Sequence, residues 1–163
     1  PFDIMYAYTD FDNSRVKIYR PYGNKDEKWF TNCTQNDIGC IDSLPISGKR
    51  LIISKSYKDC RVLRNQGLNS VWFQNEGMLP KPTLIVQLCK RFDEIIVWFD
   101  NDEAGLKSCK IVVNYINSLF PGKARALHLD TSLLEQSIKD PSDLISKKGK
   151  TELIEFIKNK KLL

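Results

Sequence analysis

From Arg50 onward, short apolar runs alternate with longer segments that have helical spacing. The runs have the length and composition of buried strands and are RLIIS (50–54), NSVWFQ (69–74), EIIVWF (94–99) and ARALHL (124–129). The segments expected to be helical cover residues 57–65, 82–92, 103–119, 141–148 and 150–160. Because alternating strands and helices form right-handed crossovers, they build a parallel sheet that helices cover on both faces. The pattern therefore predicts an α/β fold with a roughly four-stranded parallel sheet flanked by helices.

Residues 1–48 have a different pattern. IMYAYTD (4–10) and RVKIYRP (15–21) have the alternation of two strands joined by a turn, and KWFTN (28–32) adds a third. The segment SLPISGK (43–49) then breaks the pattern, as a short linker would. We therefore expect a small basic β-rich subdomain over residues 1–48 and an α/β domain with closing helices over residues 49–163.

Composition is that of a globular protein. The 163 residues are 42% hydrophobic and 28% charged, which suits one domain with an appendage and a substantial core. No apolar run approaches the roughly 18–20 residues of a membrane span, so no membrane association is expected. The first residues lack an initiator Met and a signal peptide, and we interpret the chain as a fragment of a longer protein. Five irregularly spaced cysteines and one histidine favour a reducing compartment and argue against a zinc site.

A crowded group of carboxylates follows the third expected strand, because Asp100, Asp102 and Glu103 stand within four positions. Such like charges repel, whereas a structural turn needs only one Asp or Asn. Ligands of open parallel sheets collect at the carboxyl ends of the strands. The other strand ends deliver Lys55, Lys58 and Asp59, then Glu76, then Asp140 and Asp143. Clustered carboxylate oxygens are the ligands that Mg²⁺ prefers, and the ion offsets their repulsion.

A structural interpretation stays open beside the metal-binding one. Asp-x-Asp pairs are common in loops and at helix N-termini, and Asp143 stands where an N-cap would stand in PSDL. Glu103 would lie in the first turn of a helix, where the helix dipole favours a carboxylate. The metal-binding interpretation depends on the ordered set of acids and not on any one pair.

Three segments between about residues 50 and 147 resemble, in order, the motifs of the Toprim domain. This is the catalytic fold shared by DnaG-type primases, type IA and type II topoisomerases and several nucleases. SKSYKDCRVLRNQG is similar to the first motif, and IIVWFDNDEAG is similar to the Asp-x-Asp motif with its glycine. KDPSDL resembles the segment that follows the last strand in bacterial and phage primases and primase–helicases.

The resemblance implies a set of site residues and contains one departure. It implies that Asp100, Asp102 and Asp140 hold the metal. The family usually has a glutamate and a glycine directly after the first strand, where this chain has Lys55 and Ser56. Either the site is inactive, or Glu76 from the neighbouring strand supplies the missing carboxylate as a metal ligand and catalytic group beside Asp100 and Asp102. Lys55 and Lys58 would then bind nucleotide phosphates.

The resemblance implies the RNA-polymerase core of a primase. Such an enzyme is a nucleotidyltransferase that makes short RNA primers on single-stranded DNA from ribonucleoside triphosphates, with Mg²⁺ or Mn²⁺. Primases of this type precede the Toprim domain with a small basic β-containing subdomain, which fits residues 1–48. Basic and aromatic residues mixed on strands suit a single strand, although a solvated sheet face has the same composition. The basic residues expected to contact DNA there are Arg15, Lys17, Arg20 and Lys28.

The same resemblance implies a setting and leaves alternatives. A zinc-binding domain and a replicative helicase are expected in cis or in trans. The expected location is the cytoplasm, including that of a phage-infected bacterium. A non-catalytic Toprim module that binds nucleic acid or nucleotide, and a Toprim nuclease, are the alternative functions.

Overall fold

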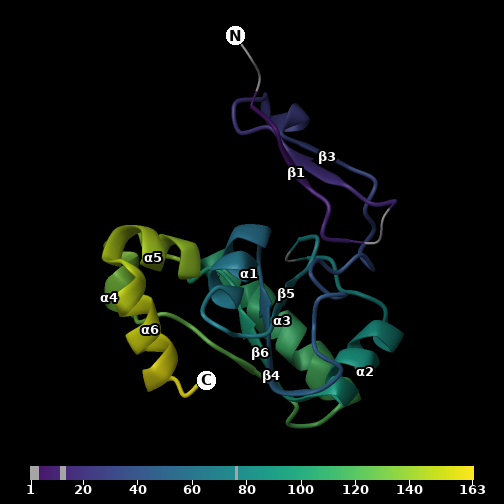
Figure 1. The fold of residues 1–163 in the computed structure, drawn as a ribbon, viewed down its shortest axis with the longest axis vertical. Helices are drawn as coiled ribbons and strands as arrows, with labels where there is room; N and C mark the ends of the chain where they lie inside the picture. The colour runs from purple at the N-terminus through teal and green to yellow at the C-terminus, as the bar shows by residue number, and fades with distance from the viewer. Residues whose placement is uncertain (1–3, 12–13, 76) are drawn as a thin grey trace.

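The parallel sheet lies among the helices at the centre of the fold (Figure 1), and its strand order is β5-β4-β6-β7. The computed structural model describes residues 4–11, 14–75 and 77–163. The four strands are β4 (Gly48–Ser54), β5 (Ser70–Trp72), β6 (Phe92–Trp98) and β7 (Ala124–Ala126). Each pairs in parallel with its neighbours. The α/β fold class and the four-stranded parallel sheet are thereby confirmed.

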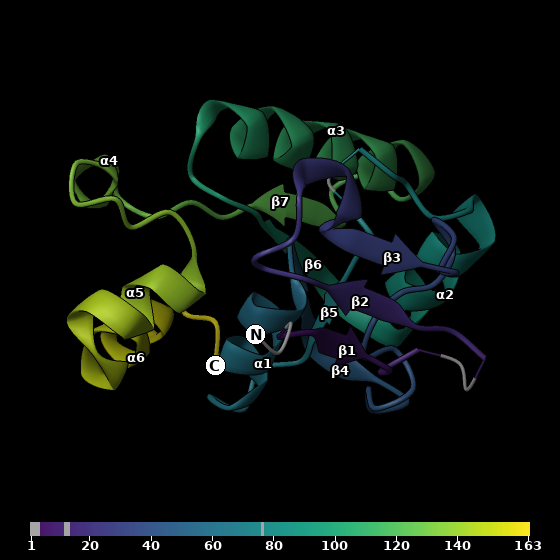
Figure 2. The same ribbon diagram turned by 90° about the horizontal axis from the view of Figure 1, so that it is seen from above.

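The two central strands are apolar on both sides because helices cover both faces of the sheet. The helices are α1 (Tyr57–Arg64), α2 (Pro82–Arg91), α3 (Glu103–Leu119), α4 (Thr131–Leu134), α5 (Pro141–Lys148) and α6 (Lys150–Asn159). One face packs against α2 and α3, and the other packs against α1, α5 and α6. Figure 2 shows α3 and the α5–α6 pair on opposite sides of the strands.

The ends of three strands lie level at one edge of the sheet. Ser54 of β4 is in register with Trp72 of β5 and with Trp98 of β6. The residues that follow these strands therefore leave the sheet side by side. This is the carboxyl edge, where the sequence predicts the functional site.

The fourth strand, β7, is shorter than expected. The expected strand over 124–129 pairs with β6 only along Ala124–Ala126, opposite Ile95–Val97. Leu127 and Leu129 are buried although they lie outside the strand, and the short helix α4 follows them. Apolar content alone predicted a longer strand, because burial at this position comes from packing against helices and not from strand pairing.

A second, antiparallel sheet lies at the N-terminal end of the chain. Its strands are β1 (Tyr6–Tyr8), β2 (Lys17–Tyr19) and β3 (Trp29–Thr31), and a single 3₁₀ turn, η1 (Lys25–Glu27), lies between β2 and β3. The strands pair in the order β1-β2-β3. Figure 1 shows this sheet set apart from the parallel sheet, and in the view of Figure 2 it lies in front of the parallel strands. The three expected N-terminal strands are confirmed.

The junction between the two sheets is packed. Phe11 and Cys40 are buried against Trp72 of β5 and Cys60 of α1, and the Trp72 Nε1 donates to Asp10 Oδ2 at 2.8 Å. Ile38 and Leu44 belong to the main core. Residues before the expected boundary thus help to cover the parallel sheet, and the boundary at residue 48 stays a prediction.

The charge of the N-terminal segment differs from the expectation. Residues 1–48 contain five Lys and Arg but seven Asp and Glu, a formal charge of −2. The term basic therefore does not hold for this segment as a whole. Since the whole chain carries +5, the positive charge is concentrated in residues 49–163. None of the described helices is long and apolar enough to cross a bilayer.

Candidate metal centre

Three carboxylates from three different elements meet at the carboxyl edge of the parallel sheet. Asp59 comes from α1, Asp100 follows β6, and Asp140 precedes α5. One oxygen of each lies within 4.8 Å of the others. Opposite oxygen ligands of Mg²⁺ are about 4 Å apart, because each bond is about 2.1 Å long. The donor set is therefore one that a hard divalent cation prefers, and the three oxygens lie near enough for such an ion to draw them to its own ligand spacing.

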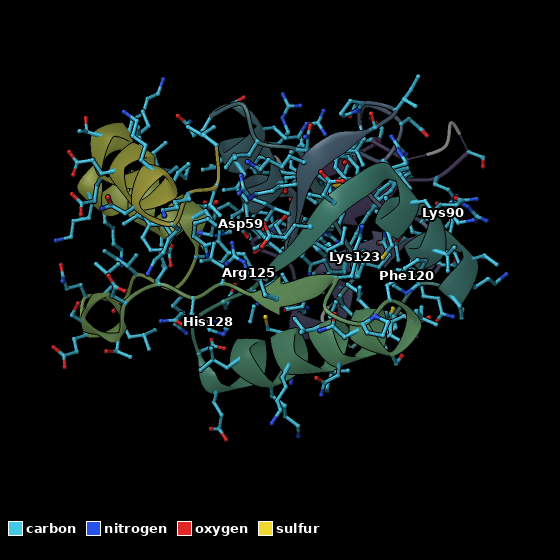
Figure 3. All side chains as sticks on the ribbon, turned by 90° about the horizontal axis from the view of Figure 1, so that it is seen from below. Asp59, Lys90, Phe120, Lys123, Arg125 and His128 are labelled. Atoms are coloured by element: carbon cyan, nitrogen blue, oxygen red, sulfur yellow. The ribbon has the colours of Figure 1, made fainter. Side chains whose placement is uncertain are left out.

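Asp59 is fixed by serine hydroxyls from two helix N-termini. Ser56 caps α1, and its hydroxyl donates to Asp59 Oδ2 at 2.5 Å. Ser142 of α5 donates to Asp59 Oδ1 through its hydroxyl at 2.6 Å and its backbone N–H at 3.3 Å. Figure 3 shows Asp59 between the α5–α6 pair and the strands. The carboxylate is buried and is oriented before any ligand arrives.

Asp140 is the N-cap of α5. Its Oδ1 accepts from the backbone N–H of Asp143 at 2.7 Å, and Pro141 stands at the first helical position. The sequence left Asp143 open as the cap, but Asp143 lies in the first turn and accepts from the Lys139 N–H at 3.1 Å. With Oδ1 bound to the helix, Oδ2 of Asp140 faces the lysine on α1.

Asp100 is placed by the tight start of α3. A Cβ on Gly105 would lie 2.1 Å from the Asp100 carbonyl oxygen, so only glycine allows α3 to begin this close to β6. Asn101 is buried and fastens the same turn. Its backbone N–H donates to the Lys139 carbonyl at 2.8 Å, and its side chain donates to the Leu129 carbonyl at 3.0 Å.

Asp102 lies outside the three-carboxylate group. It is the N-cap of α3, and its Oδ1 accepts from the Gly105 N–H at 3.0 Å. Its Oδ2 lies 3.0 Å from the Lys139 ammonium. The Gly105 N–H and then the Lys139 ammonium hold the pKa of Asp102 below its usual value. The structural role is therefore present, and metal binding by Asp102 stays a prediction.

Two lysines complete the centre. The Lys55 ammonium lies 2.5 Å from Asp100 Oδ2, and it stands where the resemblance to Toprim domains implies a glutamate. The Lys58 ammonium lies 2.5 Å from Asp140 Oδ2 and 3.7 Å from Asp59 Oδ1. Burial lowers the pKa of Lys58, but Asp59 and Asp140 outweigh burial and raise it overall. Both lysines expected to bind nucleotide phosphate thus contact carboxylates of the three-carboxylate group.

The burial of Asp59 gives the centre a pH dependence. Burial, followed by the negative charge of Asp140, raises the pKa of Asp59 to about 6. Because a protonated carboxyl binds Mg²⁺ poorly, we expect Mg²⁺ affinity to rise between pH 5 and pH 7. Asp59→Asn should flatten this rise as well as weaken binding, and calorimetric titration across this range measures both. A wild-type affinity that is constant from pH 5 to pH 7 would contradict the assignment.

The same pKa affects stability in the unusual direction for an aspartate. The folded pKa lies above the ordinary value of 3.8, so the folded state holds the proton more tightly. The stability that the protein gains from this tighter proton binding is fully present below pH 3.8, and it is lost as the pH rises through about 6. Asp59→Asn should therefore remove a destabilising contribution at pH 7, which pH-dependent denaturant unfolding of both proteins can measure.

Glu76 lies outside the described residues. The strand before it, β5, lies beside β4 in the sheet, as the sequence interpretation requires. Its proposed role as the substitute for the missing family glutamate stays a prediction.

The basic residues expected on the N-terminal sheet already have protein contacts. The Lys17 ammonium lies 2.5 Å from the Gln74 carbonyl and over the rings of Trp29 and Trp72. Arg15 donates to the Asn32 carbonyl and lies 3.6 Å from Asp37. Arg20 lies 3.7 Å from Glu27, and Lys28 is half-buried. Lys17 therefore links the two sheets, and contacts of these four residues with DNA stay predictions.

Sequence comparison finds no matching family model and no matching curated protein. Structure comparison finds similarity to the primase fragment of the bacteriophage T7 primase–helicase, with a TM-score of 0.65 and 18% identity. The DnaG primase catalytic domain bound to single-stranded DNA gives a TM-score of 0.69 and 16% identity. The Aquifex aeolicus primase, with its zinc-binding and RNA polymerase domains, gives 0.65 and 17%.

These similarities extend over nearly the whole chain but only part of each relative. They cover 94%, 96% and 89% of this chain, in the order given, and 62%, 52% and 36% of the solved structures. The antiparallel sheet and the parallel sheet together thus have the fold of primase catalytic cores. At these identities the likeness shows the fold alone.

Proposed function

We propose that this chain is the RNA-polymerase core of a primase, with a Toprim domain that synthesises short RNA primers on single-stranded DNA. The observation that carries the proposal is the meeting of Asp59, Asp100 and Asp140 at the carboxyl edge of the sheet, within a primase-type fold. The three acids come from three separate elements, and together they carry more negative charge than the two lysines paired with them can balance. A site for Mg²⁺ or Mn²⁺ explains the arrangement.

The proposed chemistry would use the residues at this edge. A ribonucleotide 3′-hydroxyl loses its proton to water and attacks the α-phosphate of a ribonucleoside triphosphate. One P–O bond forms, and pyrophosphate leaves with the electrons of the P–O bond that breaks. A bound divalent ion supplies activation of the hydroxyl and neutralisation of phosphate charge. Asp59, Asp100 and Asp140 would hold it, with Asp102 and Glu76 as further candidate ligands. Ser56 and Ser142 keep the Asp59 carboxylate in a fixed orientation.

The partners belong to the same proposal. The substrates are single-stranded template DNA and ribonucleoside triphosphates, and the setting is DNA replication in a cytoplasm, including that of a phage-infected bacterium. A zinc-binding domain and a replicative helicase would act in cis or in trans. The chain spans about a third to two thirds of the solved primases above, which leaves room for such domains in a longer protein.

One observation favours a second candidate, a binding module without catalysis. Lys55 pairs with Asp100 where Toprim domains usually carry a glutamate, so a positive charge stands where a metal ligand is expected. A domain that had lost its chemistry would still hold a nucleotide or a nucleic acid through such lysines.

Primer synthesis distinguishes the two candidates. The chain is incubated with single-stranded DNA of mixed sequence, labelled ribonucleoside triphosphates and Mg²⁺, and the products are separated by length. The proposal predicts labelled oligoribonucleotides that disappear when a chelator removes the metal. Binding of Mg²⁺ and nucleotide without any product would favour the binding module.

A further inference from the structure

Two lysine ammonium groups contact carboxylates that would hold the metal ion. Lys55 contacts Asp100 Oδ2, and Lys58 contacts Asp140 Oδ2, each at 2.5 Å. Both carboxylates belong to the three-carboxylate cluster. Lys58 also lies 3.7 Å from Asp59, the third member. Each carboxylate of the cluster therefore has a lysine nearby.

Ammonium groups in these positions compete with a divalent cation. Both bind the same carboxylates, and the like charges of the ammonium groups and the metal repel at such short range. The lysines thus stabilise the cluster when no metal is bound, and they must leave these contacts when one binds.

The two side chains are able to move. The Lys58 side chain is 57% exposed and the Lys55 side chain is 34% exposed. Each ammonium ends a flexible four-carbon stem, unlike the planar fork of an arginine. By contrast, Asp59 and Asp140 are held by hydrogen bonds from helix N-termini. Metal binding would therefore displace the lysines and leave these two carboxylates in place.

We propose that Lys55 and Lys58 are exchangeable counter-ions, which pair with the carboxylates before metal binding and with the triphosphate of the nucleotide afterwards. This inference rests on the proposed function, because a metal-bound nucleotide supplies the phosphates. Displaced ammonium groups remain beside the edge of the sheet, and phosphate oxygens are strong acceptors for them. The exchange couples metal binding to nucleotide binding and gives Lys55 a role in an active site.

The proposal predicts effects of opposite sign from one substitution. Lys55→Met and Lys58→Met each remove a competitor of the metal, so Mg²⁺ should bind more tightly in the absence of nucleotide. Each also removes a phosphate partner, so the nucleotide should bind more weakly when Mg²⁺ is saturating. We expect about a tenfold change in each affinity, within the usual range of coupling between two ligands.

Calorimetry on the full chain measures both affinities. Mg²⁺ is titrated alone, and a ribonucleoside triphosphate analogue with a methylene bridge between its α- and β-phosphates is titrated at saturating Mg²⁺. The matched control is Arg61→Met, which removes the same charge from an exposed position one turn beyond Lys58 on α1. The control should change either affinity by less than about twofold, because it tests only long-range charge. Melting temperatures establish that all variants are folded.

The outcomes separate this inference from the proposed function. If wild-type protein binds Mg²⁺ but neither lysine variant binds it more tightly, the exchange is wrong and the metal site stands. If Arg61→Met changes the affinities as much as the lysine variants do, long-range charge alone explains the changes. That outcome would also overturn the exchange. If the wild-type protein binds no Mg²⁺ at millimolar concentration, both the exchange and the proposed function fail.

Discussion

Asp100→Asn should reduce Mg²⁺-dependent primer synthesis by about 10²–10³-fold, the scale on which loss of one group that stabilises transition-state charge acts. Asp100 stands at the end of β6, paired with Lys55 and within 4.8 Å of two other carboxylates. Asparagine has nearly the same shape but lacks the negative charge that a metal ligand needs. The loss should therefore appear in the rate and in Mg²⁺ affinity rather than in folding.

Stability is expected to change by less than about 1 kcal/mol, because loss of the ion pair with Lys55 is offset by weaker repulsion within the cluster. Asp130→Asn is the matched control, since Asp130 is exposed and pairs only loosely with Lys160, at 3.6 Å. Rates from saturating Mg²⁺ and nucleotide, with melting temperatures, measure both effects. Full activity of Asp100→Asn would remove the metal assignment, and equal losses in both variants would show a non-specific effect of charge.

Gly105→Ala should destabilise the protein by about 3 kcal/mol or more, at the upper end of the cost of overpacking. The added Cβ would lie 2.1 Å from the Asp100 carbonyl oxygen, and a backbone atom cannot rotate away as a side chain can. The start of α3 must then move away from β6. Because Asp100 and Asp102 both lie in this turn, primer synthesis by the remaining folded protein should also fall.

Gly77→Ala provides the comparison for this prediction. Its Cβ would have its nearest neighbour at 3.5 Å, which is ordinary contact, so unfolding in denaturant should give a change of less than about 1 kcal/mol. A Gly105→Ala protein as stable as the wild type would show that α3 does not need its close start. The account of how Asp100 is positioned would then be wrong.

The central part of the fold follows from local sequence. The helix expected over 103–119 is present with the same bounds, because Asp102 caps its start and Phe120-Pro121-Gly122 ends it. Trp72, Trp98 and Phe99 are buried, in agreement with their places on or beside apolar strands. The length of β7 does not follow from local sequence, because the apolar residues past Ala126 are buried by helices rather than by strand pairing.

Two members of the carboxylate cluster were expected as metal ligands at this edge from the sequence, and the third was not. Asp100 and Asp140 were expected at the carboxyl edge, and they lie there together. Asp59 was noted at a strand end but was not among the expected ligands. Its spacing from Ser56 is a local signal, because a capping serine three residues before an acid marks a helix start. Its contact with Ser142 depends on α5 packing beside α1, which no local pattern contains.

The lysine pairs were not accessible from sequence for the same reason. Lys55 and Lys58 reach acids 45 and 82 residues away in the chain. Their partners are decided by which strand ends meet in three dimensions. The charge of residues 1–48, by contrast, follows from the sequence alone, because seven acids, most of them outside the expected strands, outnumber five bases.

Anomalous diffraction from a crystal grown with Mn²⁺ tests the central claim most directly, because it locates the metal independently of activity. The account predicts a manganese peak in contact with carboxylate oxygens of Asp59, Asp100 and Asp140, at about 2.2 Å. In the electron density of the same crystal, the side chains of Lys55 and Lys58 should have left Asp100 and Asp140. A peak held by other residues, or none at this edge at millimolar Mn²⁺ with both lysines still on their carboxylates, would contradict it.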